Sequence, residues 1–166
     1  MGPVFRKRAL DGAMPEIALP KGYRIQETRT LSEEQFAERA TTESEGFDRT
    51  VTVAFLRELE RSPIYRPKLD LAITTLDASI AAFCTIWFDE RHQVGFYEPV
   101  GTASAHRQRG LAKALLIEGF RRLSKMGATT AYLGNSAANR AGNRLYESIG
   151  MAIFDQEHWW QKQPSL

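Results

Sequence analysis

The chain has 166 residues, of which 43% are hydrophobic and 25% are charged. These values are typical of a single globular domain that buries a core. The formal net charge is only +2, so the protein as a whole is not the polycation that non-specific binding to nucleic acid requires.

The first third of the sequence predicts one strand and two helices. Residues 1–20 contain three prolines and little periodicity, and we expect a loosely structured N-terminal arm there. A short strand is expected over residues 22–28. Ser32 followed three residues later by Gln35 has the spacing of a capping box, which predicts the start of a helix. A second helix is expected over residues 50–62, immediately before a proline that ends it.

The middle of the sequence predicts three antiparallel strands joined by short turns. We expect them over residues 69–76, 80–88 and 94–102, because apolar residues alternate with polar ones in the first and run continuously in the second. Pro99 lies in the third of these strands and has no N–H to donate. A bulge, or a strand that diverges from its neighbour, is therefore expected at Pro99.

The last third predicts helices that alternate with strands. Apolar residues repeat at helical spacing over residues 111–126, and a glycine follows as a helix end. A strand is expected over residues 129–134, a short helix over residues 140–150, and one or two strands over residues 151–163. This order of elements predicts an α/β (α+β mixed) fold with a mixed sheet.

Cysteine and histidine content argues against a disulfide framework and against a metal site. The single cysteine, Cys84, lies in an apolar run, and we expect a buried thiol in a cytoplasmic protein. The three histidines, His92, His106 and His158, are far apart and have no cysteine partners, so no metal is expected. Neither a signal peptide nor a membrane-spanning segment is expected.

The stretch HRQRGLAKALL, residues 106–116, places two arginines and a glycine at the start of a helix. It is open to three interpretations: an ordinary helix start that is basic, a patch for nucleic-acid phosphates, and a seat for a phosphorylated ligand. The helix dipole disfavours Arg107 and Arg109 at an ordinary start, and aromatic residues that stack on bases are missing nearby. A strand, a tight loop with Gly110 and a helix start together favour the anion seat. The sequence contains neither G-x-x-x-x-G-K-[ST] nor G-x-G-x-x-G after a strand.

Two motifs carry a resemblance to a known family. Arg107, Gly110 and Ala112 form R-x-x-G-x-A, which resembles the acyl-CoA pyrophosphate loop of the GNAT superfamily of N-acetyltransferases. The segment NRAGNRLYESIGM is similar to the C-terminal signature of that family, N-x-x-A-x-x-L-Y-x-x-x-G-[FM]. Asn139 takes the first position, and the chain departs from the pattern at Gly142, where the family usually has alanine.

The resemblance covers roughly residues 21–160 and implies a fold. It implies one GNAT-like acyltransferase domain over residues 21–166, with a central, mostly antiparallel mixed sheet and helices on both faces. The fourth and fifth expected strands, residues 94–102 and 129–134, would splay apart. The pantetheine arm of acetyl-CoA would lie in the gap.

The resemblance also implies which residues bind acetyl-CoA. Main-chain groups of one strand would pair with pantetheine, loop residues would bind the pyrophosphate largely through backbone N–H groups, and a lysine would add charge. In that order these residues are Val100, Gly101 and Thr102; Arg107, Gln108, Arg109, Gly110, Leu111 and Ala112; and Lys113. Asn139 would reach the pantetheine arm, and as an asparagine it is equally suited to cap the last helix.

Two catalytic residues are expected. Tyr146 lies where the family has a phenol that protonates the leaving thiolate, although a tyrosine at this place could equally belong to the core. Glu98 is the best candidate for the general base, and a solvated strand glutamate is the alternative. His92 and Tyr97 are weaker candidates for the base. The backbone N–H of Val100 or Gly101 could polarise the thioester carbonyl.

The function expected is acetyl-CoA-dependent N-acetyl transfer to a primary amine of a small molecule or peptide. The alternatives are an acyl-CoA-binding sensor or partner of the same fold without turnover, and a nucleic-acid module. We expect no nucleic acid, no membrane and no metal, and a homodimer is possible by analogy. Three segments would choose the acceptor: residues 41–50, 89–93 and 158–160. The acids Glu43, Glu45 and Asp48 hint at a cationic acceptor.

Overall fold

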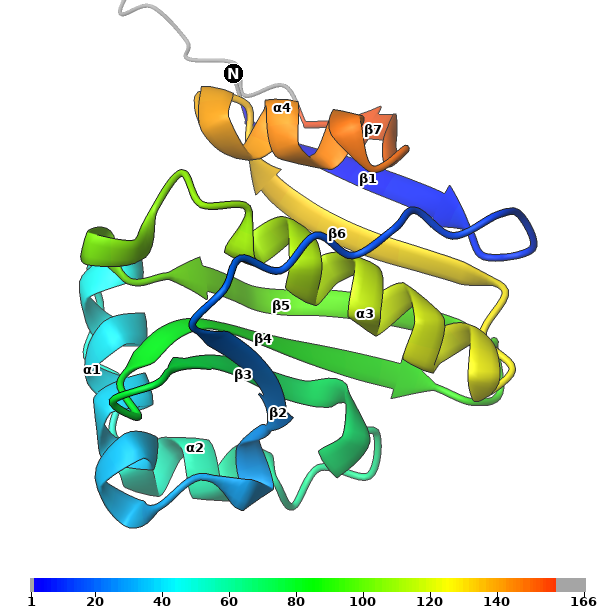
Figure 1. Ribbon diagram of the computed structural model, residues 1–166. Coiled ribbons are helices and arrows are strands. Elements are labelled where there is room, and N and C mark those ends of the chain that lie inside the picture. Colours follow the sequence, from blue (N-terminus) through cyan, green and yellow to red (C-terminus); the bar gives the residue numbers. More distant parts are fainter. Residues whose placement is uncertain (1, 158–166) are drawn as a thin grey trace, which may run out of the picture.

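A seven-stranded sheet forms the centre of the computed structural model, which describes residues 2–157 (Figure 1). The strands are β1 (Pro3–Ala9), β2 (Tyr23–Glu27), β3 (Asp70–Thr75), β4 (Ile80–Asp89), β5 (Val94–Thr102), β6 (Thr130–Ser136) and β7 (Ala152–Gln156). The helices are α1 (Glu33–Phe47), α2 (Val53–Leu59), α3 (Leu111–Lys125) and α4 (Arg140–Ser148). This alternation confirms the α/β class and the order of elements from the first expected strand onward.

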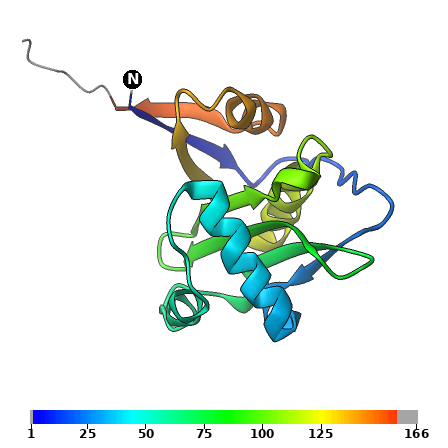
Figure 2. The same ribbon diagram turned by 90° about the vertical axis from the view of Figure 1, so that its left-hand side faces the viewer.

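The strands follow the order β2-β3-β4-β5-β6-β1-β7. All neighbours are antiparallel except β5 and β6, so the sheet is mixed and mostly antiparallel, as expected. Helices cover both faces: α3 and α4 lie on one, and α1 lies on the other together with α2 (Figures 1 and 2). None of the helices among residues 2–157 is long and apolar enough to cross a membrane.

Local signals determine where the helices begin. Ser32 and Gln35 form the expected capping box: the Ser32 side chain accepts from the Gln35 N–H, and the Gln35 side chain accepts from the Ser32 N–H. Helix α2 begins later than expected because Thr52 caps it, its side chain accepting from the N–H of Phe55, and it ends earlier than expected, at Leu59. Such caps satisfy orphan N–H groups of a first helical turn.

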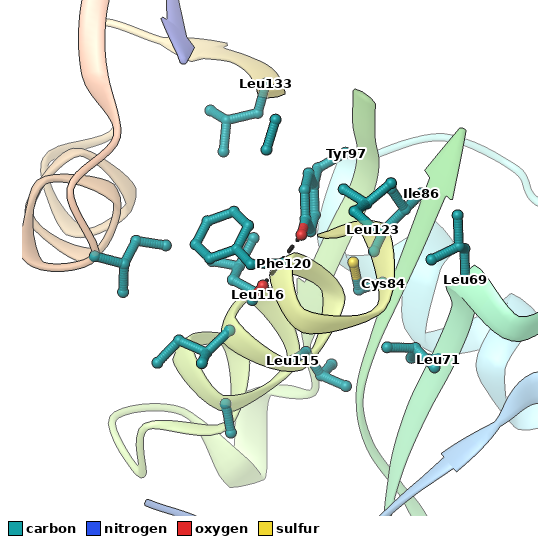
Figure 3. Packing of buried hydrophobic residues seen from close by; sticks show 14 of the residues in the cluster. Leu69, Leu71, Cys84, Ile86, Tyr97, Leu115, Leu116, Phe120, Leu123 and Leu133 are labelled. Atoms are coloured by element: carbon teal, nitrogen blue, oxygen red, sulfur yellow. Dashed lines mark hydrogen bonds between the residues drawn. The ribbon is translucent and has the colours of Figure 1, made fainter. Parts of the chain in front are cut away.

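The main core lies between α3 and the middle strands (Figure 3). Leucines and aromatic residues of α3, such as Leu115 and Phe120, pack against strand residues such as Leu71 and Ile86. Tyr97 of β5 is buried among them, and its hydroxyl donates to the carbonyl oxygen of Leu116 at 3.1 Å. The α3 helix is thereby fixed on the sheet, which places the start of the helix at one end of β5.

The N-terminal segment differs from the expectation of a loosely structured arm. Pro3–Ala9 form β1, which lies between β6 and β7 and pairs with both. The connection from β1 to β2, residues 10–22, is bonded to α3, because Arg121 donates to the carbonyl oxygen of Pro15 at 3.1 Å. The prediction was therefore wrong for Pro3–Ala9, which form an inner strand of the sheet. At the other end only β7 is described, and the rest of the expected strand lies outside the described residues.

The middle of β5 contains the irregularity expected at Pro99. Cys84 of β4 faces Val100, but Ile86 faces Tyr97, so two residues of β5 stand opposite one of β4. This register shift is a bulge of β5. Just before the bulge β5 also leaves β6, because the two strands pair only over Val94–Phe96 and Thr130–Tyr132. The expected splay between these strands is therefore present.

Candidate functional site

A pocket with a volume of about 700 Å³ opens where β5 and β6 diverge. Four parts of the chain line it: the end of β5, the loop and first turn of α3, the first two turns of α4, and the C-terminal end of α1. The lining residues are Gly46, Phe47, Val100, Gly101, Thr102, His106, Arg107, Gln108, Gly110, Leu111, Ala112, Lys113, Asn139, Ala141, Gly142, Arg144, Leu145 and Tyr146. Its size is in the range of pockets that hold a small organic ligand.

One wall is the free edge of β5. Val100, Gly101 and Thr102 pair with β4 on one side, and their pairing with β6 has ended several residues earlier. A strand edge of this kind offers unpaired main-chain groups to an extended ligand. A side chain at Gly101 would collide with the ring of Phe83, so glycine keeps the strand close to β4 here.

The floor is the start of α3. Gly110 is its N-cap residue, with φ of 76°, and within residues 2–157 no side chain caps the helix. Gln108 also has a positive φ, of 61°. This loop conformation leaves the first N–H groups of α3 without intrahelical partners, and the helix dipole makes the same place attractive to an anion. Arg107 and Lys113 at the pocket wall add positive charge.

Tyr23 of β2 supports the loop that precedes α3, and the sequence did not indicate this role. Its hydroxyl lies 2.9 Å from the Nδ1 atom of His106 and accepts from Arg109 at 2.9 Å. The rings of Tyr23 and His106 also meet edge to face, with centroids 5.7 Å apart. Because 83 residues separate the two, no local signal could have revealed the contact. Arg109 itself faces a second cavity beside Leu19 rather than the main pocket.

The opposite wall is α4, which carries Asn139 and Tyr146. Asn139 caps the helix, its side chain accepting from the N–H of Gly142 at 2.9 Å. A Cβ atom at position 142 would lie 2.7 Å from the Asn139 amide nitrogen, so the Asn139 side chain would have to shift for an alanine there. The capping role of Asn139 is thus present, and the residue also lines the pocket.

Tyr146 is 8% exposed and lines the pocket from the last turn of α4. Burial raises the pKa of its phenol above the ordinary value, the nearby Cys84 thiol adds to the rise, and the charge of Arg6 opposes it. Within residues 2–157 the hydroxyl makes no hydrogen bond. A phenol of this kind remains protonated at neutral pH, which suits a proton donor.

The candidate base lies at the bulge. Glu98 is exposed and is not among the pocket-lining residues. Its carbonyl oxygen accepts from Trp87 Nε1 at 2.7 Å, which fixes the backbone of the bulge. The two weaker candidates lie elsewhere: Tyr97 is bonded in the core, and His92 is paired with Asp89 in an exposed turn.

The three acids expected near the acceptor differ in environment. Glu43 is fully buried and paired with Arg49 at 2.7 Å and with the buried Arg39 at 3.8 Å. Glu45 and Asp48 are exposed, on either side of the pocket-lining end of α1. The expected tryptophans of residues 158–160 lie outside the described residues.

Comparison with known proteins assigns the family. The sequence model of the Acetyltransferase (GNAT) family matches residues 29–151, which is more than half of the chain. The chain therefore belongs to this family of acetyltransferases. Acetyl-CoA is the acetyl donor of the family, and amines are its acceptors. No curated protein sequence matches the chain.

Solved structures share the fold. A GCN5-related N-acetyltransferase from Sphaerobacter thermophilus is 28% identical with a TM-score of 0.75, covering 92% of this chain and 48% of that one. The ribosomal-protein-S18-alanine N-acetyltransferase from Escherichia coli is 21% identical, with a TM-score of 0.63 over 77% of this chain and 76% of that one. An aminoglycoside antibiotic 6'-N-acetyltransferase from Acinetobacter baumannii is 16% identical, with a TM-score of 0.65 over 87% and 100%. The chain thus spans about half the length of the Sphaerobacter protein, and the other two likenesses concern the fold alone.

Proposed function

We propose that the protein transfers an acetyl group from acetyl-CoA to a primary amine by direct attack of the amine on the thioester. The observation that carries the proposal is that one pocket joins the free edge of β5, the uncapped start of α3 and the buried Tyr146. These are the groups that a ligand with an extended amide arm, a diphosphate and a thioester needs.

The lining of the pocket supports one arrangement of acetyl-CoA, which is part of the proposal. The main chain of Val100 to Thr102 would pair with the pantetheine arm in place of β6. The N–H groups from Gly110 to Ala112 and the charges of Arg107 and Lys113 would bind the diphosphate. Asn139 would contact the arm across the pocket while it continues to cap α4. Gln108 and Leu111 complete the seat, and Arg109 supports it through Tyr23.

The transfer then needs two proton movements. The neutral amine nitrogen forms a bond to the carbonyl carbon, and the bond from that carbon to sulfur breaks. The carboxylate of Glu98, directly or through water, accepts the proton that the nitrogen loses, while Tyr146 gives its proton to the leaving thiolate. The N–H of Val100 or Gly101 stabilises the charge on the carbonyl oxygen in between. Amine and thioester thus become amide and thiol; Glu98 releases its proton to solvent and Tyr146 regains one, so both residues return to their starting states.

The acceptor side of the pocket favours a cationic small molecule or peptide amine. Gly46 and Phe47 at the end of α1 line the pocket, and the exposed acids Glu45 and Asp48 flank them. Negative charge at this entrance would raise the local concentration of a cation.

The experiment is a panel of amines incubated with acetyl-CoA and assayed for free CoA, together with thermal unfolding in the presence of acetyl-CoA. Binding to the native state raises its stability, by about 2.7 kcal/mol at a hundredfold excess over Kd. Absence of any stabilisation by acetyl-CoA or CoA would reject the proposal. Stabilisation without CoA release for any amine would support the alternative, an acyl-CoA-binding protein without turnover. The position of Glu98 outside the pocket lining is the observation that favours this alternative.

A further inference from the structure

Arg6 of β1 is a buried arginine whose hydrogen bonds within residues 2–157 all go to α4 or to Met151, just after that helix. It is 1% exposed, although it belongs to the segment that the sequence predicted to be a loose arm. Its guanidinium donates to the side chains of Asn143 and Glu147 and to the carbonyl oxygen of Met151, each at 3.0 Å. A buried guanidinium is retained in a fold only when such partners are well placed.

These three contacts bracket Tyr146. Asn143 lies three residues before it, and Glu147 directly follows it on the same short helix. Asn143 is itself held, since it accepts from the Asn135 side chain at 2.9 Å and donates to the carbonyl oxygen of Ala137 at 3.1 Å. Because the Tyr146 hydroxyl has no hydrogen bond within residues 2–157, the position of the phenol depends on how firmly the helix around it is held.

We propose that Arg6 is a positioning residue of the acetyltransferase site, which fixes α4 and keeps the phenol of Tyr146 at the pocket wall. The inference rests on the proposed role of Tyr146 as the proton donor. Strand β1 would then do more than pair with β6 and β7, between which it lies. It would carry the residue that orients Tyr146, the proposed proton donor.

Electrostatics supports the same coupling. Burial raises the pKa of Tyr146, whereas the positive charge of Arg6 lowers it, since a nearby cation favours the phenolate. Removal of that charge therefore raises the pKa of Tyr146 further and makes the phenol a weaker acid. The proton of Tyr146 would then be given up less readily to the thiolate.

Arg8 is a matched control on the same strand. It lies two residues further along β1, on the same face, and donates to the carbonyl oxygen of Ile149 at 2.7 Å and to that of Ala13 at 3.0 Å. It therefore also ties β1 to the end of α4, and it packs over the ring of Phe120. Unlike Arg6 it makes no hydrogen bond to a side chain of α4 within residues 2–157, and its charge is not among the causes of the Tyr146 pKa shift.

The test is a double-mutant cycle. Arg6→Met and Arg8→Met are made in the parent and in Tyr146→Phe, and kcat and the KM for acetyl-CoA are measured with the best amine of the panel. We expect Arg6→Met to lower kcat on the order of tenfold in the parent with KM unchanged. In Tyr146→Phe the same substitution should change kcat less than about twofold, because effects that act through one residue are not additive. Arg8→Met should lower the unfolding temperature and leave kcat unchanged in both backgrounds.

Three outcomes would overturn the proposal. The first is an equal loss of kcat from Arg6→Met in both backgrounds, which would indicate a purely structural role. The second is an unchanged kcat of Arg6→Met in the parent. The third is a Tyr146→Phe variant as fast as the parent. If Arg6→Met does not fold, Arg6→Lys, which keeps the charge and loses the planar fork, is compared in the same cycle.

A second measurement does not depend on turnover. In protein labelled with ¹³C at the hydroxyl-bearing ring carbon of tyrosine, the Tyr146 signal is assigned by its loss in Tyr146→Phe. Its titration should move to higher pH in Arg6→Met and stay in place in Arg8→Met. An unmoved titration in Arg6→Met refutes the coupling. A parent protein that acetylates no amine refutes the proposed function instead, and this titration still decides whether Arg6 acts on Tyr146.

Discussion

Gly110 is the residue whose replacement tests the anion seat most directly. It is the N-cap residue of α3 with φ of 76°, a conformation that side chains other than glycine rarely adopt. A Cβ atom built at this position meets nothing within 4 Å, so Gly110→Ala introduces no collision. The whole cost is the left-handed backbone, about 1–2 kcal/mol.

That cost predicts both stability and affinity. If the cost is about 1 kcal/mol, the unfolding temperature of Gly110→Ala should fall by about 2–4 °C for a chain of this length. If the loop escapes the strain by leaving its conformation, acetyl-CoA must restore it on binding. The Kd for acetyl-CoA then rises in inverse proportion to the fraction of molecules whose loop has the binding conformation. For a cost of about 1–2 kcal/mol the rise is about 5-fold to 30-fold.

Gly127 provides the matched control at the other end of the same helix. Its φ is 90°, a Cβ atom there also meets nothing within 4 Å, and it is not a pocket-lining residue. Gly127→Ala should therefore lose similar stability and keep the affinity of the parent. Thermal unfolding gives the first quantity, and titration calorimetry with acetyl-CoA gives the second. Equal affinities of the two variants for acetyl-CoA would refute the assignment of this loop as the diphosphate seat.

Three further substitutions, with Tyr132→Phe as a control, distinguish residues that bind acetyl-CoA from residues that catalyse the transfer. Tyr146→Phe should keep the Kd for acetyl-CoA and lower kcat about a hundredfold, and a variant as active as the parent would exclude this phenol as the donor. Glu98→Gln should likewise bind acetyl-CoA and transfer slowly, whereas unchanged steady-state rates would remove it as the base. Tyr23→Phe deletes the hydroxyl that bonds His106 and Arg109. At about 1 kcal/mol for each of these hydrogen bonds, the KM for acetyl-CoA should rise by up to about 30-fold with kcat unchanged. Tyr132→Phe on β6, outside the pocket, should leave the KM as it is.

Elements with local signals could be predicted from the sequence. The Ser32 capping box, the three-strand meander and the bulge at Pro99 each depend on residues close together in the chain, and the structure contains all three. The pocket could be located for the same reason, because its two motifs are short segments. The roles of the single residues within the pocket remain proposals.

Strand β1 could not be predicted because its pattern is inverted. The residues that alternate toward the covered face are Val4, Arg6 and Arg8, so two of three inward positions carry charge. A period of two in hydrophobicity is the signal of a half-buried strand, and arginines at those places remove it. Most of the acceptors of Arg6 and Arg8 come from α4 and the residues just after it, Ile149 and Met151, more than 130 residues later. Contacts between residues so far apart in the chain, such as the one between Tyr23 and His106, cannot be predicted from either segment alone.

The acidic character of the acceptor side is weaker than the sequence implied. Among the three acids of residues 41–50, Glu43 is directed into the fold, where Arg39 and Arg49 neutralise it. Arg39 in turn donates to Thr85 at 2.7 Å and to Asp70 at 3.3 Å, so Glu43 belongs to a buried network that ties α1 to β3 and β4. Glu43 in this network stabilises the position of α1, whose end lines the pocket. Its charge is balanced by the two arginines and is not directed toward a ligand. Of these three acids, the two exposed ones, Glu45 and Asp48, would attract a cationic amine, and at a surface site that attraction weakens as salt is added.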